Sequence, residues 1–231
     1  MSSKKFDAFI DMWRNDYAIE RSIDKQICLD KDDQPLPWYT YPAIEYLRQF
    51  DYRDKKVFEF GVGYSCAFWA QRALNVQAVE NDKDWFARWQ NELRADNLRI
   101  LLCLDDENYE NALDDNYDVI AIDGKRRLQC ARQALRHLND GGMIIVDDSD
   151  RVNTSADYQK LIAELKAAGL LQVDFFGCCP MNNFTKVTSV FLHRNFAFNT
   201  LQKIQPVNAI GNLWGKGRAE RKKFYKENCS I

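Results

Sequence analysis

The sequence has none of the long apolar runs that mark a membrane protein or a secreted one. Its longest stretches without a charged residue, 60–71 and 204–215, have 12 residues each. That is well short of the roughly 20 apolar residues that a membrane-spanning helix needs. The first 16 residues mix acidic side chains into apolar positions and lack the apolar core of a secretory signal. We therefore expect no membrane span and a cytoplasmic location.

Histidine is scarce, and the cysteines follow no pairing pattern. Neither His137 nor His193 lies near a serine or cysteine elbow motif, so a nucleophilic triad has no support. The seven cysteines include no C-x-x-C pair, and Cys178 and Cys179 are adjacent, which suits tetrahedral zinc poorly. An odd number of cysteines without such spacing is typical of a reduced, cytosolic chain.

Charge of one sign does not dominate the whole chain. The 231 residues carry a formal net charge of -2, which gives no overall argument for nucleic acid or an anionic membrane, and we expect no nucleic-acid partner. Residues 199–231 nevertheless hold seven basic and two acidic side chains, so this tail is basic and the remainder acidic. We interpret the tail as a solvated segment or a helix lying on the acidic body, with a polyanion or partner contact as the alternative.

Short β-rich runs alternate with helical periodicity through the centre of the chain. This alternation indicates an α/β fold in which a mostly parallel sheet is covered by helices on both faces. A helix is expected after Asp123, ended by Gly141-Gly142. The expected parallel strands are 56–60, 76–80, 98–104, 117–123 and 143–147.

The last third of the chain predicts a change of strand direction. A helix over 156–168 is followed by strands at 170–176 and 187–193. The polar loop between these strands is too short for a crossover helix, which indicates an antiparallel pair. The sequence thus predicts a Rossmann-like, doubly wound sheet of seven strands, mostly parallel with one antiparallel strand. The predicted divisions are an N-terminal helical cover (1–50), the Rossmann-like domain (51–198) and the basic tail (199–231).

The most informative stretch runs from Val57 to Ala70. A hydrophobic strand containing Glu59 leads into Gly61-x-Gly63-x-Ser65 and then a helix. Glycine permits a tight strand-to-helix turn, and its missing Cβ lets a ligand approach the backbone. The helix N-terminus offers free N–H groups to a carboxylate or phosphate. Without its context, a glycine pair is equally a plain tight turn.

A second strand supplies that context, because it ends in Glu80, 19 residues after Gly61. Rossmann-type folds place at this spacing the carboxylate that accepts ribose hydroxyls, which indicates a nucleoside ligand. The spacing fits a dinucleotide and S-adenosylmethionine alike. Three features count against the dinucleotide: the turn lacks a third glycine, Glu59 would repel a pyrophosphate, and the sheet ends in a reversed strand.

The order of these motifs resembles the class I S-adenosylmethionine-dependent methyltransferases over residues 37–194. FEFGVGYSCAFWA and IIVDDSDR are similar to the FEyGsGxST and DDSDR signatures of a small bacterial-type group, although Cys66 stands where that pattern has threonine. The resemblance implies that residues 51–198 bind S-adenosylmethionine, with Glu80 on the ribose hydroxyls and Asp105 beside adenine. The cofactor-binding residues that it implies are Glu59, Gly61, Gly63, Ser65, Glu80, Asp105 and Asp123.

Carboxylates at the carboxyl ends of parallel strands point into the crevice where ligands bind, which agrees with this implication. Any one of them is as readily a helix N-cap or turn residue. Methyl transfer needs alignment and the exclusion of water, and a hydroxyl acceptor also needs a base or a cation that lowers its pKa. The predicted catalytic residues are Asp123, Lys125 and Asp148, with Asp147 as a further candidate.

Asp123, Asp147 and Asp148 also resemble the carboxylates that hold magnesium in catechol-type O-methyltransferases. Oxygen ligands of this kind suit Mg²⁺, so these three are the predicted metal ligands. Asp148, however, stands where those enzymes commonly have asparagine. The DDSDR segment is equally readable as an N-cap and salt-bridge cluster that opens the next helix.

Several residues at the same edge are candidates for holding the acceptor. Arg126, Arg127 and Arg151 suit an acidic or sugar-phosphate acceptor, although pairing with neighbouring acids is the favoured interpretation. The loop 177–186 borders the expected crevice and is a candidate substrate determinant.

Three aromatic residues, Trp38, Tyr39 and Tyr41, suit the floor of an acceptor pocket, with packing against the sheet as the commoner role. The sequence thus predicts a methyltransferase that moves the methyl group of S-adenosylmethionine to a small-molecule or glycan-like acceptor, at oxygen. The alternatives are a non-catalytic nucleoside-binding scaffold or regulatory subunit, and an NAD-dependent oxidoreductase.

Overall fold

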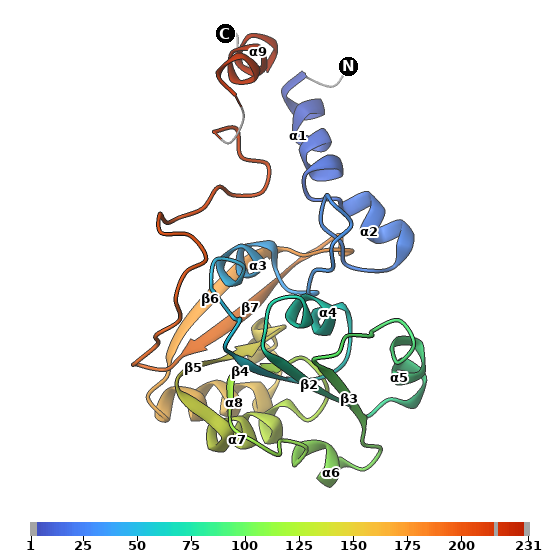
Figure 1. The fold of residues 1–231 in the computed structure, drawn as a ribbon, viewed down its shortest axis with the longest axis vertical. Coiled ribbons are helices and arrows are strands. Elements are labelled where there is room, and N and C mark those ends of the chain that lie inside the picture. The colour runs from blue at the N-terminus through green and yellow to red at the C-terminus, as the bar shows by residue number, and fades with distance from the viewer. Residues whose placement is uncertain (1–3, 215–216, 229–231) are drawn as a thin grey trace.

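A computed structural model describes residues 4–214 and 217–228 (Figure 1). Seven strands form one sheet in the order β3-β2-β1-β4-β5-β7-β6. Six strands run in one direction, and β7 runs against both of its neighbours, β5 and β6. The predicted seven-stranded sheet with one reversed strand is confirmed. The strands are β1 (Lys56–Phe60), β2 (Asn75–Glu80), β3 (Leu98–Leu102), β4 (Tyr117–Ile122), β5 (Leu138–Val146), β6 (Leu171–Cys178) and β7 (Thr185–Leu192).

Helices cover both faces of this sheet because alternate residues of each strand point to opposite sides. Val57 and Val119 lie in the cluster under α3 and α4, whereas Phe58 and Ile120 lie in the cluster under α7 and α8. The helices are α1 (Lys4–Asn15), α2 (Ile19–Lys25), α3 (Tyr41–Leu47), α4 (Tyr64–Ala70), α5 (Lys83–Trp89), α6 (Asp106–Glu110), α7 (Arg127–His137), the 3-10 turn η1 (Ser149–Asn153), α8 (Ala156–Ala167) and α9 (Arg218–Asn228).

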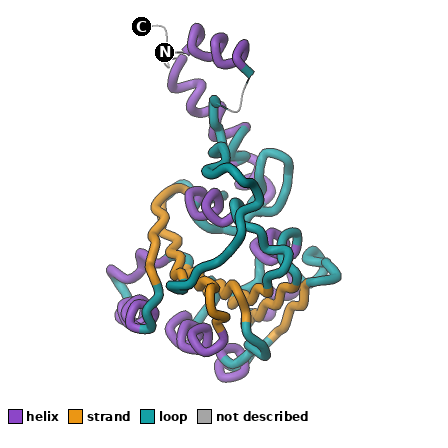
Figure 2. Tube along the Cα trace, turned by 60° about the vertical axis from the view of Figure 1, so that its left-hand side comes forward, coloured by secondary structure: helices purple, strands orange, loops and turns teal. Residues whose placement is uncertain are grey.

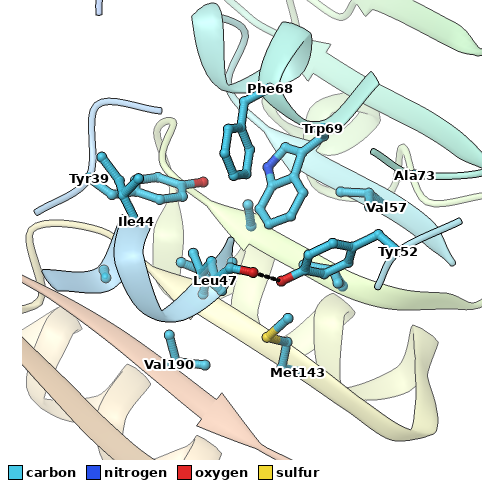
Figure 3. Packing of buried hydrophobic residues seen from close by; sticks show 14 of the residues in the cluster. Tyr39, Ile44, Leu47, Tyr52, Val57, Phe68, Trp69, Ala73, Met143 and Val190 are labelled. Atoms are coloured by element: carbon cyan, nitrogen blue, oxygen red, sulfur yellow. Dashed lines mark hydrogen bonds between the residues drawn. The ribbon is translucent and has the colours of Figure 1, made fainter. Parts of the chain in front are cut away.

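The hydrophobic cluster beneath α3 and α4 holds in place the helix that follows the predicted ligand-binding turn. Figure 3 shows Phe68 and Trp69 from α4 meeting Leu47 from α3 over the sheet. Tyr52 lies among them, and its hydroxyl group donates a hydrogen bond to the carbonyl oxygen of Leu47 at 2.8 Å. All four side chains are almost fully buried. The helix that follows the glycine turn is therefore anchored on a close-packed support.

The glycine pair at 141–142 lies inside a strand and not at a helix end. Helix α7 stops at His137, and β5 begins at once with Leu138, so the prediction that the glycines end the helix is wrong. The pairing of β4 with β5 shifts register between Tyr117 and Val119. A Cβ on Gly142 would lie 2.6 Å from the carbonyl oxygen of Asp118. The glycines therefore permit a close approach of two backbones within an irregular stretch of sheet.

The loop between the last two strands is shorter than the sequence predicts. Strand β6 continues to Cys178 and β7 already begins at Thr185, so only residues 179–184 lie outside the antiparallel pair. The antiparallel pairing itself is confirmed. Strand β6 runs two residues past its predicted end, and β7 begins two residues before its predicted start, because backbone pairing continues as far as Cys178 and Thr185.

The two ends of the chain project together from one side of the body. Figures 1 and 2 show α1 and α9 side by side, away from the sheet. Residues leading to α9 are tied to α3, since the Ile210 N–H donates to Glu45 Oε1 at 2.9 Å. Residues 218–228 of the basic tail thus form α9 beside α1, while Lys216 and residues 229–231 lie outside the described residues.

None of the helices in 4–214 and 217–228 is long and apolar enough to cross a membrane. The six cysteines in those ranges are free thiols, and Cys229 lies outside them.

Candidate functional site

A cavity of about 740 Å³ opens where the parallel strands end. Ligands of doubly wound sheets bind at this edge. One group of lining residues, the glycine half, belongs to the turn after β1, the end of β2, α5 and the segment after α2: Gln26, Ile27, Cys28, Glu59, Gly61, Val62, Gly63, Tyr64, Ser65, Glu80, Trp85 and Trp89. The other group, the acidic half, follows β4 and β5 and precedes β7: Trp38, Asp123, Gly124, Asp147, Asp148, Asp150, Arg151, Met181, Asn182, Phe184, Thr185 and Lys186.

Gly61 and Gly124 bring the ends of β1 and β4 into backbone contact. Gly61 has φ +107°, and a Cβ there would lie 3.1 Å from the Gly124 nitrogen. A Cβ on Gly124 would lie 2.0 Å from the hydroxyl oxygen of Tyr109. Gly63 differs, because its backbone is extended and a Cβ would meet only the Ser65 hydroxyl, at 3.8 Å. The first two glycines are needed by the fold, whereas Gly63 keeps open space beside the backbone.

The Glu80 carboxylate fixes the turn to the end of β2. Its Oε2 accepts a hydrogen bond from the Val62 N–H at 3.1 Å. Its Oε1 accepts from the N–H groups of Asn81 and Asp82, at 2.8 and 2.9 Å. A carboxylate has about four acceptor positions, so these bonds leave acceptor capacity on Oε2 beside the cavity. The predicted closeness of Glu80 to the glycine turn is found.

Glu59 is a carboxyl group almost without contact with water. Its side chain lies at the end of β1, where Cys66 donates to Oε2 at 3.1 Å and the Tyr39 hydroxyl donates to Oε1 at 3.4 Å. Burial raises the pKa of Glu59 to about 8, although hydrogen bonds from Ser65 and Cys66 oppose this shift. Glu59 is therefore mostly protonated at neutral pH while the cavity holds no charged partner.

Asp123, Asp147 and Asp148 meet in the acidic half, as predicted. Each has a carboxylate oxygen within 4.8 Å of one from each of the others. Asp123 follows β4, and the other two follow β5, so the parallel pairing of these strands brings them together. We call these three residues the acidic cluster.

Arg127 holds the two strand ends that carry the acidic cluster. Its guanidinium donates to the carbonyl oxygens of Gly124 at 2.9 Å and Asp123 at 3.0 Å, and also to that of Asp147. It lies 3.1 Å from the Asp123 carboxylate, with 9% of its side chain exposed. The planar fork of arginine lets one side chain bridge several oxygens at once.

Lys186 supplies a second buried cation. Its ammonium group contacts Asp147 Oδ2 and lies 3.2 Å from Asp148 Oδ1, with 8% of the side chain exposed. Burial lowers the pKa of Lys186, but the charges of Asp147, Asp123 and Asp148 raise it above the ordinary value for lysine. The ammonium is therefore charged throughout the neutral range.

The residues of the acidic cluster do not fit the Mg²⁺ that the sequence predicted. Their three carboxylates face three cations, since Arg151 lies 3.0 Å from Asp148 in addition to Lys186 and Arg127. A magnesium ion needs oxygen ligands in octahedral geometry. It would have to displace the ammonium group from between Asp147 and Asp148.

Two predicted site residues lie outside the lining of the cavity. Asp105, predicted beside adenine, caps α6: its Oδ1 accepts from the Asn108 N–H at 2.8 Å, and the side chain is exposed. Lys125, predicted to be catalytic, follows Gly124 but is exposed and does not line the cavity. The alternative interpretation of Asp105 as an N-cap is thus what the structure supports.

The aromatic and arginine candidates also include residues that line the cavity and residues that do not. Trp38 lines the cavity, whereas Tyr39 is buried beneath it, and Tyr41 packs against Tyr17 with ring centroids 4.7 Å apart. Arg126 lies 3.2 Å from Asp106 and also pairs with Glu110. The favoured interpretation of the arginines as partners of neighbouring acids is confirmed by these pairs and by those of Arg127 and Arg151.

Three parts of the lining were missed by sequence reasoning. Trp85 and Trp89, four residues apart on α5, both line the cavity, and Trp89 is at the same time buried in a core cluster with Cys66 and Leu93. Residues 26–28 come from the predicted cover. Lys186 ends the loop that the sequence predicts as a substrate determinant, but nothing in the local sequence places it beside Asp147. The loop itself does reach the cavity, where Asn182 Oδ1 accepts from Trp38 Nε1 at 3.1 Å.

No protein-family model matches the chain, and no curated protein matches it either. Among solved structures, precorrin-6y C5,15-methyltransferase from Geobacter metallireducens GS-15 is 13% identical, with 73% of this chain and 96% of that chain covered and a TM-score of 0.52. The N-methyltransferase NodS from Bradyrhizobium japonicum WM9 is 11% identical, covering 60% and 85%, with a TM-score of 0.43. A Streptococcus mutans protein crystallised in complex with SAH is 12% identical, covering 64% and 94%, with a TM-score of 0.45.

Of these three structures, the Geobacter enzyme alone has a TM-score above 0.5. At this level of identity the similarity concerns the fold. The chain has a Rossmann-like fold similar to that of this methyltransferase.

Proposed function

We propose that this chain binds S-adenosylmethionine in the glycine half of the cavity and transfers its methyl group to an oxygen atom of an acceptor in the acidic half. The observation that carries the proposal is the Glu80 carboxylate, which is bonded to the Val62 N–H of the glycine turn and keeps acceptor capacity beside the cavity. A carboxylate in this position suits the two ribose hydroxyls of a nucleoside.

The rest of the glycine half suits the other parts of the donor. Gly63 leaves room for the methionine part beside the backbone, and Ser65 adds a hydroxyl to the lining. Glu59 lies below it as a buried carboxyl, and the donor's ammonium group favours its charged form. The indole rings of Trp85 and Trp89 offer flat apolar surfaces.

In the reaction, the electrons of the sulfur–methyl bond stay on sulfur while an acceptor oxygen bonds to the methyl carbon. A hydroxyl acceptor releases a proton at this stage, and a carboxylate acceptor does not. Asp123 is our candidate base, because it lines the cavity and is directed by Arg127 at 3.1 Å. Asp148 acts indirectly in this scheme, through its contacts with Lys186 and Arg151.

The acceptor that we propose is a small molecule or a glycan with a flat apolar face. Trp38 and Phe184 line the acidic half with 39% and 60% of their surfaces exposed. Exposed aromatic rings stack on sugar or aromatic rings at modest entropic cost. Their polar neighbour Asn182 offers an amide for orientation.

Calorimetry with S-adenosylhomocysteine tests the proposal directly. The wild-type chain is expected to bind it, and Glu80→Gln is expected to bind it about 10-fold to 100-fold more weakly, because a charge-assisted hydrogen bond to the ligand is lost. Asp105→Asn is the matched control, since asparagine keeps the cap of α6. The proposal is wrong if neither S-adenosylmethionine nor S-adenosylhomocysteine gives binding heat, and NADH binding in their place would favour an oxidoreductase. Binding of the donor without turnover on any extract of metabolites would favour a non-catalytic scaffold.

A further inference from the structure

Lys186 reaches the acidic cluster because of the reversed strand. It lies near the start of β7, which runs antiparallel to β5, so it faces the end of β5 where Asp147 and Asp148 follow. Its ammonium contacts both carboxylates, and it lies 5.9 Å from the ring centroid of Trp38. A parallel strand at this position would bring its carboxyl end, and not its start, to the cavity.

A second residue of β7 fixes the orientation of the partner acid. Thr188, two residues after Lys186 and thus on the same face of the strand, donates to Asp147 Oδ1 at 2.7 Å. One oxygen of Asp147 is therefore bonded to the threonine and the other to the ammonium. Both atoms belong to groups almost fully buried in the sheet. The Asp147–Lys186 pair is therefore a buried, hydrogen-bonded ion pair and not a surface contact.

The charges around the cluster are already balanced without an ion. Asp123 pairs with Arg127, Asp147 with Lys186, and Asp148 with Lys186, Arg127 and Arg151. A divalent cation inserted here would meet two buried cations at close range. The repulsion between like charges at such distances is large where water is excluded.

We propose that the ammonium group of Lys186 stands in this fold where a divalent cation would otherwise be held, so that the acidic cluster is complete without a metal. In one respect the proposal extends the proposed function and rests on it. An ammonium has three donor hydrogens. Lys186 donates to Asp147, forms an ion pair with Asp148 at 3.2 Å and lines the cavity, so its ammonium can also donate to the acceptor oxygen or face the negative charge of a phenolate or carboxylate acceptor.

Titration with Mn²⁺ tests whether the lysine excludes the ion. The wild-type chain is expected to bind no Mn²⁺ at the cluster at roughly millimolar concentration, whereas Lys186→Ala is expected to bind one ion per chain, because Asp147 then has no cation partner and the space between Asp147 and Asp148 is open to an ion. Calorimetry and the loss of the free Mn²⁺ signal in electron paramagnetic resonance measure this. Lys56→Ala is the matched control, since Lys56 pairs with the exposed Asp115 outside the cavity and its removal should create no site.

Thermal unfolding gives a second readout. Removal of one partner from a buried ion pair destabilises the fold, so Lys186→Ala is expected to melt below the wild type. Mn²⁺ should raise the melting temperature of this variant and leave that of the wild type unchanged, since only the variant binds the ion. Lys186→Met, which preserves more of the side-chain volume, serves if the alanine variant does not fold.

Two results would overturn the proposal. One is Mn²⁺ binding by the wild-type chain that Asp147→Asn abolishes. The other is a folded Lys186 variant that binds Mn²⁺ no better than the wild type. If neither variant folds, the wild-type titration alone decides. Binding of S-adenosylhomocysteine is measured on the same samples, so a failure of the proposed function is seen separately from a failure of the metal prediction.

Discussion

Glu59→Gln tests how the fold perturbs a buried carboxyl group. Glutamine has the same shape as glutamic acid. Its amide oxygen can accept the hydrogen bond that Cys66 donates to Glu59 Oε2, and its NH2 group, in the place of Oε1, can donate to the hydroxyl oxygen of Tyr39. The amide does not titrate. The variant therefore differs from the wild type mainly in the missing ionisation, and its effect is expected to depend on pH.

The magnitude follows from the pKa of Glu59, which burial raises from 4.5 to about 8. The folded protein holds this proton more tightly than the unfolded chain, so the free energy of unfolding falls as pH rises through the interval between the two values. A shift of this size corresponds to about 5 kcal/mol in total. Roughly 3 to 4 kcal/mol of it is lost between pH 5 and pH 8.

Urea denaturation at a series of pH values measures the effect. At pH 5 the two proteins are expected to have similar stability, and at pH 8 the variant should be the more stable by roughly 3 kcal/mol. Other buried acids, such as Asp123, titrate in both proteins and largely cancel from the difference. Parallel curves of unfolding free energy against pH would refute the reasoning.

The same carboxyl group links protonation to the proposed donor. The donor's ammonium favours the charged form of Glu59, so binding at pH 7 is expected to release about one proton per chain. Calorimetry in buffers of different ionisation enthalpy counts that proton. The Glu59→Gln variant should release none, and its affinity for S-adenosylhomocysteine should be lower.

Two further predictions use matched pairs of variants. Gly61→Ala is expected to lower the unfolding free energy by roughly 1 to 3 kcal/mol, because Gly61 has a positive φ and an added Cβ would lie 3.1 Å from the Gly124 backbone. Gly63→Ala should leave the melting temperature nearly unchanged and weaken S-adenosylhomocysteine binding. Equal effects of the two variants on stability would contradict the different roles given to these glycines. Arg127→Met is expected to cost about 3 to 5 kcal/mol because it removes a buried cation that contacts the Asp123 carboxylate and three backbone carbonyl oxygens. Arg132→Met, which breaks an exposed pair with Glu164, should cost less than about 1 kcal/mol in the same denaturation assay.

Much of the fold could be predicted from the sequence because the relevant signals are local. Short β-rich runs identify the strands, and the short link before Val187 predicts the antiparallel pair. The Gly61 turn and the acid at the end of β2 could be recognised together from their spacing. The error at Gly141-Gly142 arose because glycine ends a helix and permits a close strand contact equally well, and only the neighbour at Asp118 distinguishes the two.

The sequence by itself determined which runs form the strands of the sheet, where the chain turns on glycine, and that carboxylates gather at one edge. Tertiary structure alone decided that Glu59 is sealed from water, that Asp105 caps α6 while Glu80 meets the cavity, and that Lys186 lies among three acids from other strands. The reason is physical: periodicity and turn preference depend on neighbours in the chain. Desolvation and ion pairing depend on groups some forty residues apart in sequence, such as Asp147 and Lys186, which the sheet brings into contact.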